Sequence, residues 1–299
     1  MSFKQNQYDR MAVDVNTLFE RSFDYPLVKP PSYFKRALNR YFAGGLIKCG
    51  LYERLLDAGI IRFWFKEFKH YWIEVLEGRP LYFHDFFYLL GVYRERYQDV
   101  ETPDGANTEE FLNSWQNSDT LYMLFGAVRL YAQHPMSGFS TEKWINNGDS
   151  VLEYGCGIAP IAHFLLNYSL KRDLKITIAD IRQINSHYAK FRLGNLVRFL
   201  EIQPYQNPLE EQRYNTVLMI TVMEHLPNPL ETVEMITKSL KREGVFVFDY
   251  ILGDGDGHDT IEAVTQRGHV LDYIKAKYEI LEGRLLEDQS MGITVCRKK

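Results

Sequence analysis

The spacing of apolar residues divides the chain into two parts that meet near residues 146–150. In the first part, apolar positions recur every three or four residues, the spacing of one buried face of a helix. A turn-rich segment at 100–107 predicts a connection between helices. We expect helices over 32–45, with Ser32 as N-cap and Gly44-Gly45 as the end; over 51–78, as one helix or as two broken near Gly59; over 81–97; and over 108–133.

In the second part, short β-type runs alternate with helical segments. This alternation is typical of a parallel sheet that helices cover on both faces. The last two runs, 278–288 and 291–299, are too close in sequence for a crossover connection, so they should pair antiparallel. The other expected strands cover 150–155, 175–180, 197–202, 214–220 and 244–251, and the expected helices cover 159–170, 183–193 and 229–241.

Composition narrows the class of protein without identifying it. The chain has 299 residues, of which 45% are hydrophobic and 25% charged, and this suits one large globular domain or two smaller ones. The formal net charge is −4, and no block of basic residues stands out. Because binding to a phosphate backbone needs such a block, we expect no nucleic-acid partner.

Cysteine usage and the first residues of the chain suggest a compartment. Cys49, Cys156 and Cys296 are far apart and form no CxxC pair, so neither a disulfide framework nor a structural zinc site is expected. The N-terminus lacks an apolar signal core, and no stretch approaches the ~18 apolar residues of a membrane span. A cytoplasmic protein without membrane contact is the expectation.

The stretch "VLEYGCGIAP" at 151–160 is the strongest candidate for a ligand-binding turn. Glycines between a strand and a helix let a ligand approach the backbone near the N-terminus of that helix. The dinucleotide pattern GxGxxG requires a third glycine where this chain has Pro160, which suits the first turn of a helix. Glu153 would repel a diphosphate and suits a cationic or hydroxyl-bearing ligand. The turn therefore argues against a nicotinamide dinucleotide.

The order of motifs from this turn onward resembles that of class I S-adenosylmethionine-dependent methyltransferases. "VLEYGCGIAP" is similar to their first motif, an acid followed by G-x-G-x-G, with Ala159 replacing the third glycine. "ITIAD" ends in Asp180, and "YNTVLMITVMEHLPNP" and "GVFVFDY" are similar to the family's fourth and fifth strands. The resemblance covers about half of the chain. It implies an α/β fold, a Rossmann-like seven-stranded methyltransferase sheet with a C-terminal antiparallel β-hairpin, in a domain over 148–299.

The resemblance also implies the cofactor, S-adenosylmethionine, and its product S-adenosylhomocysteine. Asp180 occupies the place of the acid that binds the ribose hydroxyls in this family. The family's acid near the adenine is missing here, and Gln203 or Tyr205 could contact the ring instead, although an ordinary loop without ligand contact is an open alternative. The expected cofactor-binding residues are Glu153, Tyr154, Gly155, Cys156, Gly157, Ala159, Asp180, Ile181, Gln203 and Thr221.

Glu224 and His225 are the candidate catalytic residues, because they follow the fourth strand, where open α/β sheets bind ligands. An imidazole can act as general base for a hydroxyl or amine acceptor near neutral pH. The alternative is that both residues form a structural corner. Asp249, at the end of the fifth strand, is expected to cap the next turn rather than to contact substrate.

Two other features receive weaker interpretations. Cys156 is expected to be a packed side chain with its backbone N–H near the ligand, not a nucleophile. The loop 253–259 lacks the acid spacing of a calcium-binding loop, and His258 and Asp259 are at most weak metal ligands, so no metal site is expected.

Residues 1–147 are expected to form a mostly helical, aromatic-rich domain that selects the substrate and covers the cofactor. Most of its aromatic residues should lie in the core, while some line a substrate pocket or contact a second copy in a homodimer. The aromatic residues considered are Tyr33, Phe34, Tyr41, Phe42, Trp64, Phe65, Trp72, Phe86, Phe87 and Tyr88.

Methyl transfer to a small molecule is therefore the leading functional hypothesis. The alternatives are a non-catalytic module that binds the same cofactor and, less favoured, a nicotinamide-dependent reductase. The sequence does not distinguish an O, N or C acceptor.

Overall fold

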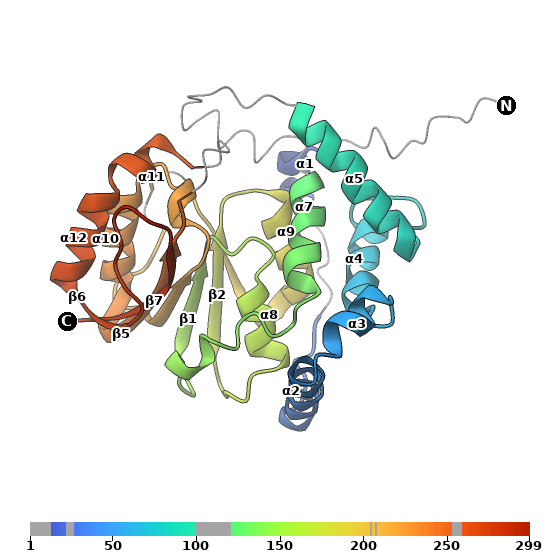
Figure 1. Cartoon of the computed structure of the whole chain (residues 1–299), viewed down its shortest axis with the longest axis horizontal. Helices are drawn as coiled ribbons and strands as arrows, with labels where there is room; N and C mark the ends of the chain where they lie inside the picture. The colour runs from blue at the N-terminus through green and yellow to red at the C-terminus, as the bar shows by residue number, and fades with distance from the viewer. Residues whose placement is uncertain (1–12, 22–26, 100–120, 204, 207, 253–258) are drawn as a thin grey trace.

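The computed structural model describes residues 13–21, 27–99, 121–203, 205–206, 208–252 and 259–299. It contains one mixed sheet with helices on both of its faces, and further helices of the N-terminal part pack outside one of these layers (Figure 1).

The sheet has seven strands in the order β3-β2-β1-β4-β5-β7-β6. The first five strands along the chain run parallel, and β7 runs antiparallel to both β5 and β6, which confirms the expected hairpin. The strands are β1 (Ser150–Tyr154), β2 (Lys175–Asp180), β3 (Arg198–Glu201), β4 (Tyr214–Met219), β5 (Leu240–Tyr250), β6 (Tyr278–Glu282) and β7 (Met291–Lys298).

The centre of the sheet is buried on both faces, which is why its strands are nearly continuous apolar runs. Leu152 of β1 pairs with Thr177 of β2 on one side and with Val217 of β4 on the other. The strand order reverses direction at β1, because β2 follows on one side and β4 on the other. In such sheets a ligand crevice forms outside the carboxyl ends of the strands at this point.

Two helical layers cover the sheet (Figure 1). The helices α10 and α12 pack on one face through Val233, Ile236 and Leu271, whereas α8 and α9 pack on the other. Residues 261–277, for which the sequence predicted no element, form two helices after β5. The helices are α8 (Pro160–Asn167), α9 (Ile184–Leu193), α10 (Pro229–Ser239), α11 (Ile261–Thr265) and α12 (Arg267–Lys277).

The N-terminal helices pack against the outer side of α9. Phe68, Tyr71 and Phe125 form one apolar cluster with Tyr188 and Phe191 of α9. Consequently α9 is buried on nearly all sides. The elements before β1 are α1 (Val15–Glu20), α2 (Tyr33–Lys48), α3 (Tyr52–Asp57), α4 (Phe63–Glu74), α5 (Phe83–Asp99), α7 (Leu121–Ala127), the π-helix η3 (Val128–Ala132) and the 3₁₀ turn η4 (Glu142–Trp144).

Several expectations for this half need correction. The helix that begins after the N-cap Ser32 does not end at Gly44-Gly45 but continues to Lys48, because nothing crowds a helical backbone there. The break near Gly59 is confirmed, with α3 and α4 on either side. The turn-rich 100–107 and the first part of 108–133 lie outside the described residues.

The expectation that most of the named aromatic residues are core is wrong. Trp64, Phe65, Trp72 and Phe86 are buried, but the other six are exposed. The division of the chain after residue 147 stays a prediction. None of the helices in the described ranges is long and apolar enough to cross a membrane.

Candidate cofactor and active site

The glycine turn after β1 adopts a conformation that its glycines permit. Gly155 and Gly157 have φ angles of +65° and +51°, in the left-handed region that favours glycine. A Cβ on Gly155 would lie 2.4 Å from a methyl carbon of Val222, so a side chain there would displace the loop after β4. At Gly157 a Cβ would meet no atom within 4 Å. The first glycine therefore permits close packing, while the second leaves open space beside the backbone.

Glu153 secures the helix that follows this turn. Its carboxylate accepts hydrogen bonds from the backbone N–H groups of Ile161 at 3.2 Å and Ala162 at 2.7 Å, in the first turn of α8. These are the N–H groups that an N-cap side chain would normally satisfy, and the N-cap here, Ala159, has no polar side chain. Burial raises the pKa of Glu153 to about 7, although both hydrogen bonds and Arg192 oppose the shift.

Asp180 joins the end of β2 to the glycine turn. Its Oδ2 accepts from the Gly157 N–H at 2.6 Å, and its Oδ1 accepts from the Ile181 N–H and from Gln183 Nε2, both at 2.8 Å. Burial raises the pKa of Asp180 to about 6, and these hydrogen bonds limit the shift. Sequence reasoning missed Gln183. The signal that could have identified it is its position as the N-cap of α9, where it forms a capping box with Ser186.

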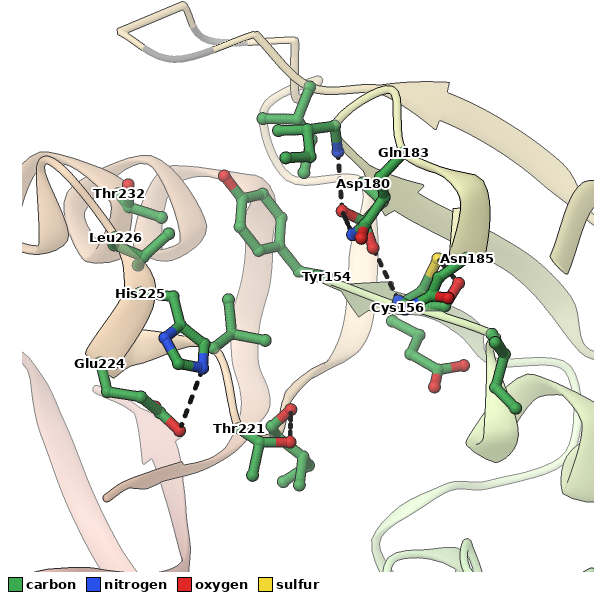
Figure 2. A pocket seen from close by; sticks show the side chains of 18 of the residues that line it. Tyr154, Cys156, Asp180, Gln183, Asn185, Thr221, Glu224, His225, Leu226 and Thr232 are labelled. Atoms are coloured by element: carbon green, nitrogen blue, oxygen red, sulfur yellow. Dashed lines mark hydrogen bonds and ion pairs between the residues drawn. The ribbon is translucent and has the colours of Figure 1, made fainter. Parts of the chain in front are cut away.

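The other expected cofactor residues gather around the same cavity, with one exception. Tyr154, Ile181, Gln203 and Thr221 line it together with the turn, whereas Ala159 is buried and does not line it. Figure 2 shows Tyr154 between the Asp180 side and the His225 side of the cavity.

Cys156 lines the cavity, and its side chain is buried and packed, as expected. Its backbone N–H donates to the carbonyl of Ala179 at 3.1 Å. Burial, reinforced by Asp180 and Glu153, raises the pKa of the thiol well above its usual value, so the thiol stays protonated.

Glu224 and His225 lie on a short 3₁₀ turn, η6 (Met223–His225), after β4. The Asp249 carboxylate accepts from the Thr221 N–H at 2.6 Å, so Asp249 caps the loop after β4 and not, as expected, the turn that follows its own strand. The Glu224 carbonyl accepts from the Thr260 N–H at 2.9 Å. These bonds hold η6 between β5 and α11, so both candidate residues have a fixed backbone.

The Glu224 side chain is buried and faces a charged neighbourhood. Its Oε1 lies 4.0 Å from His225 Nε2 (Figure 2). Burial raises the pKa of Glu224 to about 8; Asp249 and Asp259 add to the shift, and Arg267 opposes it. At neutral pH this carboxyl is therefore predominantly protonated when no cation is beside it.

A part of the N-terminal half completes the cavity. Tyr122, Met123, Ala127, Leu130 and Tyr131, from α7 and η3, line the same space as the glycine turn and the Glu224 loop. π-helices are rare and occur frequently at functional sites. Sequence reasoning did not single out these residues, because their spacing is that of any amphipathic helix.

None of the ten aromatic residues between Tyr33 and Tyr88 that were expected to form the core or the substrate pocket lines this cavity. Within the described residues, no three His, Cys, Asp or Glu side chains are grouped so that they could hold a metal ion, and His258 lies outside that range.

Comparison with known proteins identifies the family. A family model described as a methyltransferase domain matches residues 128–280, just over half of the chain. No curated protein matches. Among solved structures, a SAM-dependent methyltransferase from Aquifex aeolicus is 15% identical, with a TM-score of 0.43 over 58% of this chain and 93% of that one. A putative S-adenosyl-L-methionine-dependent methyltransferase from Methanococcus maripaludis is also 15% identical, with a TM-score of 0.44 over 67% and 97%.

The family match begins at the first residue of η3 and ends within β6, so it contains the glycine turn, Asp180 and the Glu224–His225 turn. The chain therefore belongs to the methyltransferase-domain family, the class I S-adenosylmethionine-dependent methyltransferases, and its cofactor is S-adenosylmethionine.

Proposed function

We propose that this chain is an enzyme that transfers the methyl group of S-adenosylmethionine to a small-molecule acceptor. The observation that supports this best is a single cavity of about 1000 Å³ that both the glycine turn and the Glu224–His225 turn line. Small-molecule sites usually measure ~300–1000 Å³, so this cavity has the size for cofactor and acceptor together. The same turn without an adjoining cavity would suit a module that only binds the cofactor.

The residues around the glycine turn fit this cofactor. The open space at Gly157 lets a ligand lie against the backbone, and the Asp180 carboxylate lies beside it as an acceptor for ribose hydroxyls. Gln203 and Tyr205 line the cavity beyond β3, where the adenine is expected. When bound, S-adenosylmethionine supplies a methyl group on a positively charged sulfur, which an acid-lined cavity favours.

Methyl transfer requires alignment of the acceptor and removal of its proton where it has one to lose. His225 is our candidate general base, because it lines the cavity on a turn that β5 and α11 hold in place. The helical half contributes the α7 and η3 wall, and we assign it the selection of the acceptor. All three cysteines are free, which supports a reducing, cytoplasmic location.

Binding of the cofactor product gives the direct test. Calorimetry should show binding of S-adenosylhomocysteine and none of NAD. The substitution Gly157→Ala should weaken binding of S-adenosylhomocysteine by about 10-fold or more, because the Cβ enters the space that the ligand needs. Gly148→Ala is the matched control: Gly148 also has a positive φ and no neighbour near its Cβ, but it lies before β1, away from the cavity.

Activity is tested separately with His225→Ala. We expect it to reduce kcat by about 100-fold or more and to leave the affinity for S-adenosylhomocysteine unchanged. Binding of NAD in place of S-adenosylhomocysteine would overturn the proposal. Cofactor binding without methyl transfer to any of a broad set of metabolites would favour the non-catalytic module.

A further inference from the structure

Glu224 presents an unsatisfied acceptor at the edge of the cavity. Its side chain is 5% exposed, and Oε2 has no hydrogen-bond partner within the described part of the chain. Figure 2 shows its carboxyl next to His225 on the cavity wall. A buried oxygen without a donor costs stability, so a ligand that donates a hydrogen bond here recovers that cost.

The charges near this oxygen favour a cation over an anion. Asp249 and Asp259 are the acidic neighbours of Glu224, and Arg267 is the basic one. The Arg267 guanidinium, however, donates to the backbone carbonyls of Tyr250, Leu286 and Gln289 at 2.6–3.1 Å. The guanidinium is therefore hydrogen-bonded to backbone groups that do not line the cavity.

The lining of the whole cavity has the same sign. Six carboxyl groups line it, whereas its basic lining within the described residues consists of Lys238 and the titratable His225. A phosphate or carboxylate head group would be repelled by those carboxyl groups that are ionised, whereas a cation would be attracted by them and would favour ionisation of the others. The carboxyl groups are those of Glu153, Asp180, Glu224, Glu231, Glu234 and Asp259.

The rest of the acceptor region is apolar. The lining that α7 and η3 provide consists of uncharged side chains such as Met123 and Leu130, and Ile251 and Ile293 add aliphatic surface from the sheet side. A ligand that satisfies both regions has one cationic, hydrogen-bond-donating end and an apolar body. Alcohols supply the donor without the charge, and acids supply the wrong charge.

We propose that the methyl acceptor is a small apolar amine whose nitrogen is held and deprotonated by Glu224. This inference rests on the proposed function. The ammonium form gives one proton to the Glu224 carboxylate, and the freed lone pair forms the new N–C bond. The S–C bond breaks and leaves its electron pair on sulfur. The product is a methylated ammonium ion, and the proton on Glu224 passes to solvent when the product leaves.

The environment of Glu224 suits this proton transfer. A carboxylate with an ordinary pKa is too weak a base to take a proton from an ammonium ion near neutral pH. Burial raises the pKa of Glu224 to about 8, which brings it closer to that of an amine. His225, whose Nε2 lies 4.0 Å from Glu224 Oε1, keeps its role as a base by accepting this proton from Glu224 on the way to solvent.

The test compares head groups on identical apolar bodies. Binding of 2-phenylethylamine, 2-phenylethanol and phenylacetate is measured by calorimetry with S-adenosylhomocysteine present, and the comparison is repeated with tryptamine, tryptophol and indoleacetate. We expect at least one amine to bind about 10-fold or more tightly than its alcohol, the ratio of a charge-assisted to a neutral hydrogen bond, and the acids to bind weakest.

Glu224→Gln should remove this preference by weakening the amine about 10-fold or more while the alcohol changes less than about twofold. Glu279→Gln, an exposed glutamate on β6, is the control and should behave as wild type. Equal or weaker binding of both amines compared with their alcohols, or an unchanged preference in Glu224→Gln, overturns the inference. Because S-adenosylhomocysteine binding is measured first, its failure would instead contradict the proposed function.

Discussion

At the scale of single residues, the buried carboxyl of Glu224 should make stability depend on pH. Its pKa is about 8 in the folded chain against an ordinary value of 4.5. Between these values the folded chain keeps a proton that the unfolded chain has released, so the free energy of unfolding falls as pH rises. Glutamine cannot ionise. Glu224→Gln should therefore match wild type near pH ~4.5 and exceed it near pH ~8.5, by about 2–4 kcal/mol.

Urea unfolding of both proteins across this pH range measures the difference. Glu279→Gln, whose side chain faces solvent, serves as control and should follow the wild-type profile. A constant difference between Glu224→Gln and wild type at all pH values would show that Glu224 does not titrate in this range.

At this scale the sequence identified the important acidic residues but not their hydrogen-bond partners. Glu153 and Asp180 were found because their positions beside a strand end and a glycine turn are readable in sequence. Their partners were not, because the N–H groups that Glu153 accepts from lie eight and nine positions later and meet it only once the turn has closed. Likewise, the Ala179 carbonyl that binds the Cys156 N–H belongs to a neighbouring strand, 23 positions further along the chain.

At the scale of elements, the sheet was predictable and the N-terminal helices less so. A buried parallel strand is a short apolar run with sharp ends, so β1, β2 and β4 lie within two residues of their expected bounds. The helices α11 and α12 were missed, although α12 buries Val270, Leu271 and Ile274 at helical spacing. The end of α2 was misplaced because glycine in a helix lowers stability without preventing helix formation.

Gly44 and Gly59 should respond oppositely to the same substitution. Gly44 lies within α2, and a Cβ there meets nothing within 4 Å, so Gly44→Ala should raise the free energy of unfolding by about 0.5–1 kcal/mol. Gly59 has a φ of +66°, and a Cβ there lies 2.9 Å from Phe83 Cε1. Gly59→Ala should therefore lower the free energy of unfolding by about 1–2 kcal/mol. Urea unfolding of the two variants decides this, and a loss at Gly44 would contradict the helical assignment.

At the scale of the whole molecule, α2 presents an unusual arrangement of its two faces. The face toward the protein makes polar contacts: Arg36 donates to the Lys171 carbonyl at 2.8 Å, and Arg40 pairs with Glu142 at 2.5 Å. The opposite face carries an apolar stripe at helical spacing, with exposed fractions of 78% for Phe34, 60% for Leu38, 69% for Tyr41 and 69% for Phe42. An amphipathic helix of a monomer normally has the reverse orientation.

This stripe is where we expect two copies of the chain to meet. At ~200 Å² per aromatic side chain it exposes roughly 500 Å², and Ile47 and Leu51 extend it toward the ~800 Å² that each partner contributes to a stable interface. Analytical ultracentrifugation should show a dimer for the wild type. The double variant Phe34→Ser, Phe42→Ser should sediment as a monomer, while Val264→Ser, at an exposed apolar residue of α11, should remain dimeric.

Cofactor binding should be independent of this association. The α2 side chain of Asn39 donates to the carbonyl of Asn167, the last residue of α8, whereas the cavity lies at the first residue, Pro160, roughly 10 Å away along the helix. The monomeric variant should therefore bind S-adenosylhomocysteine as wild type does. A wild-type chain that sediments as a monomer would exclude the stripe as a contact between copies, and a dimer that survives the double substitution would place the contact on another face.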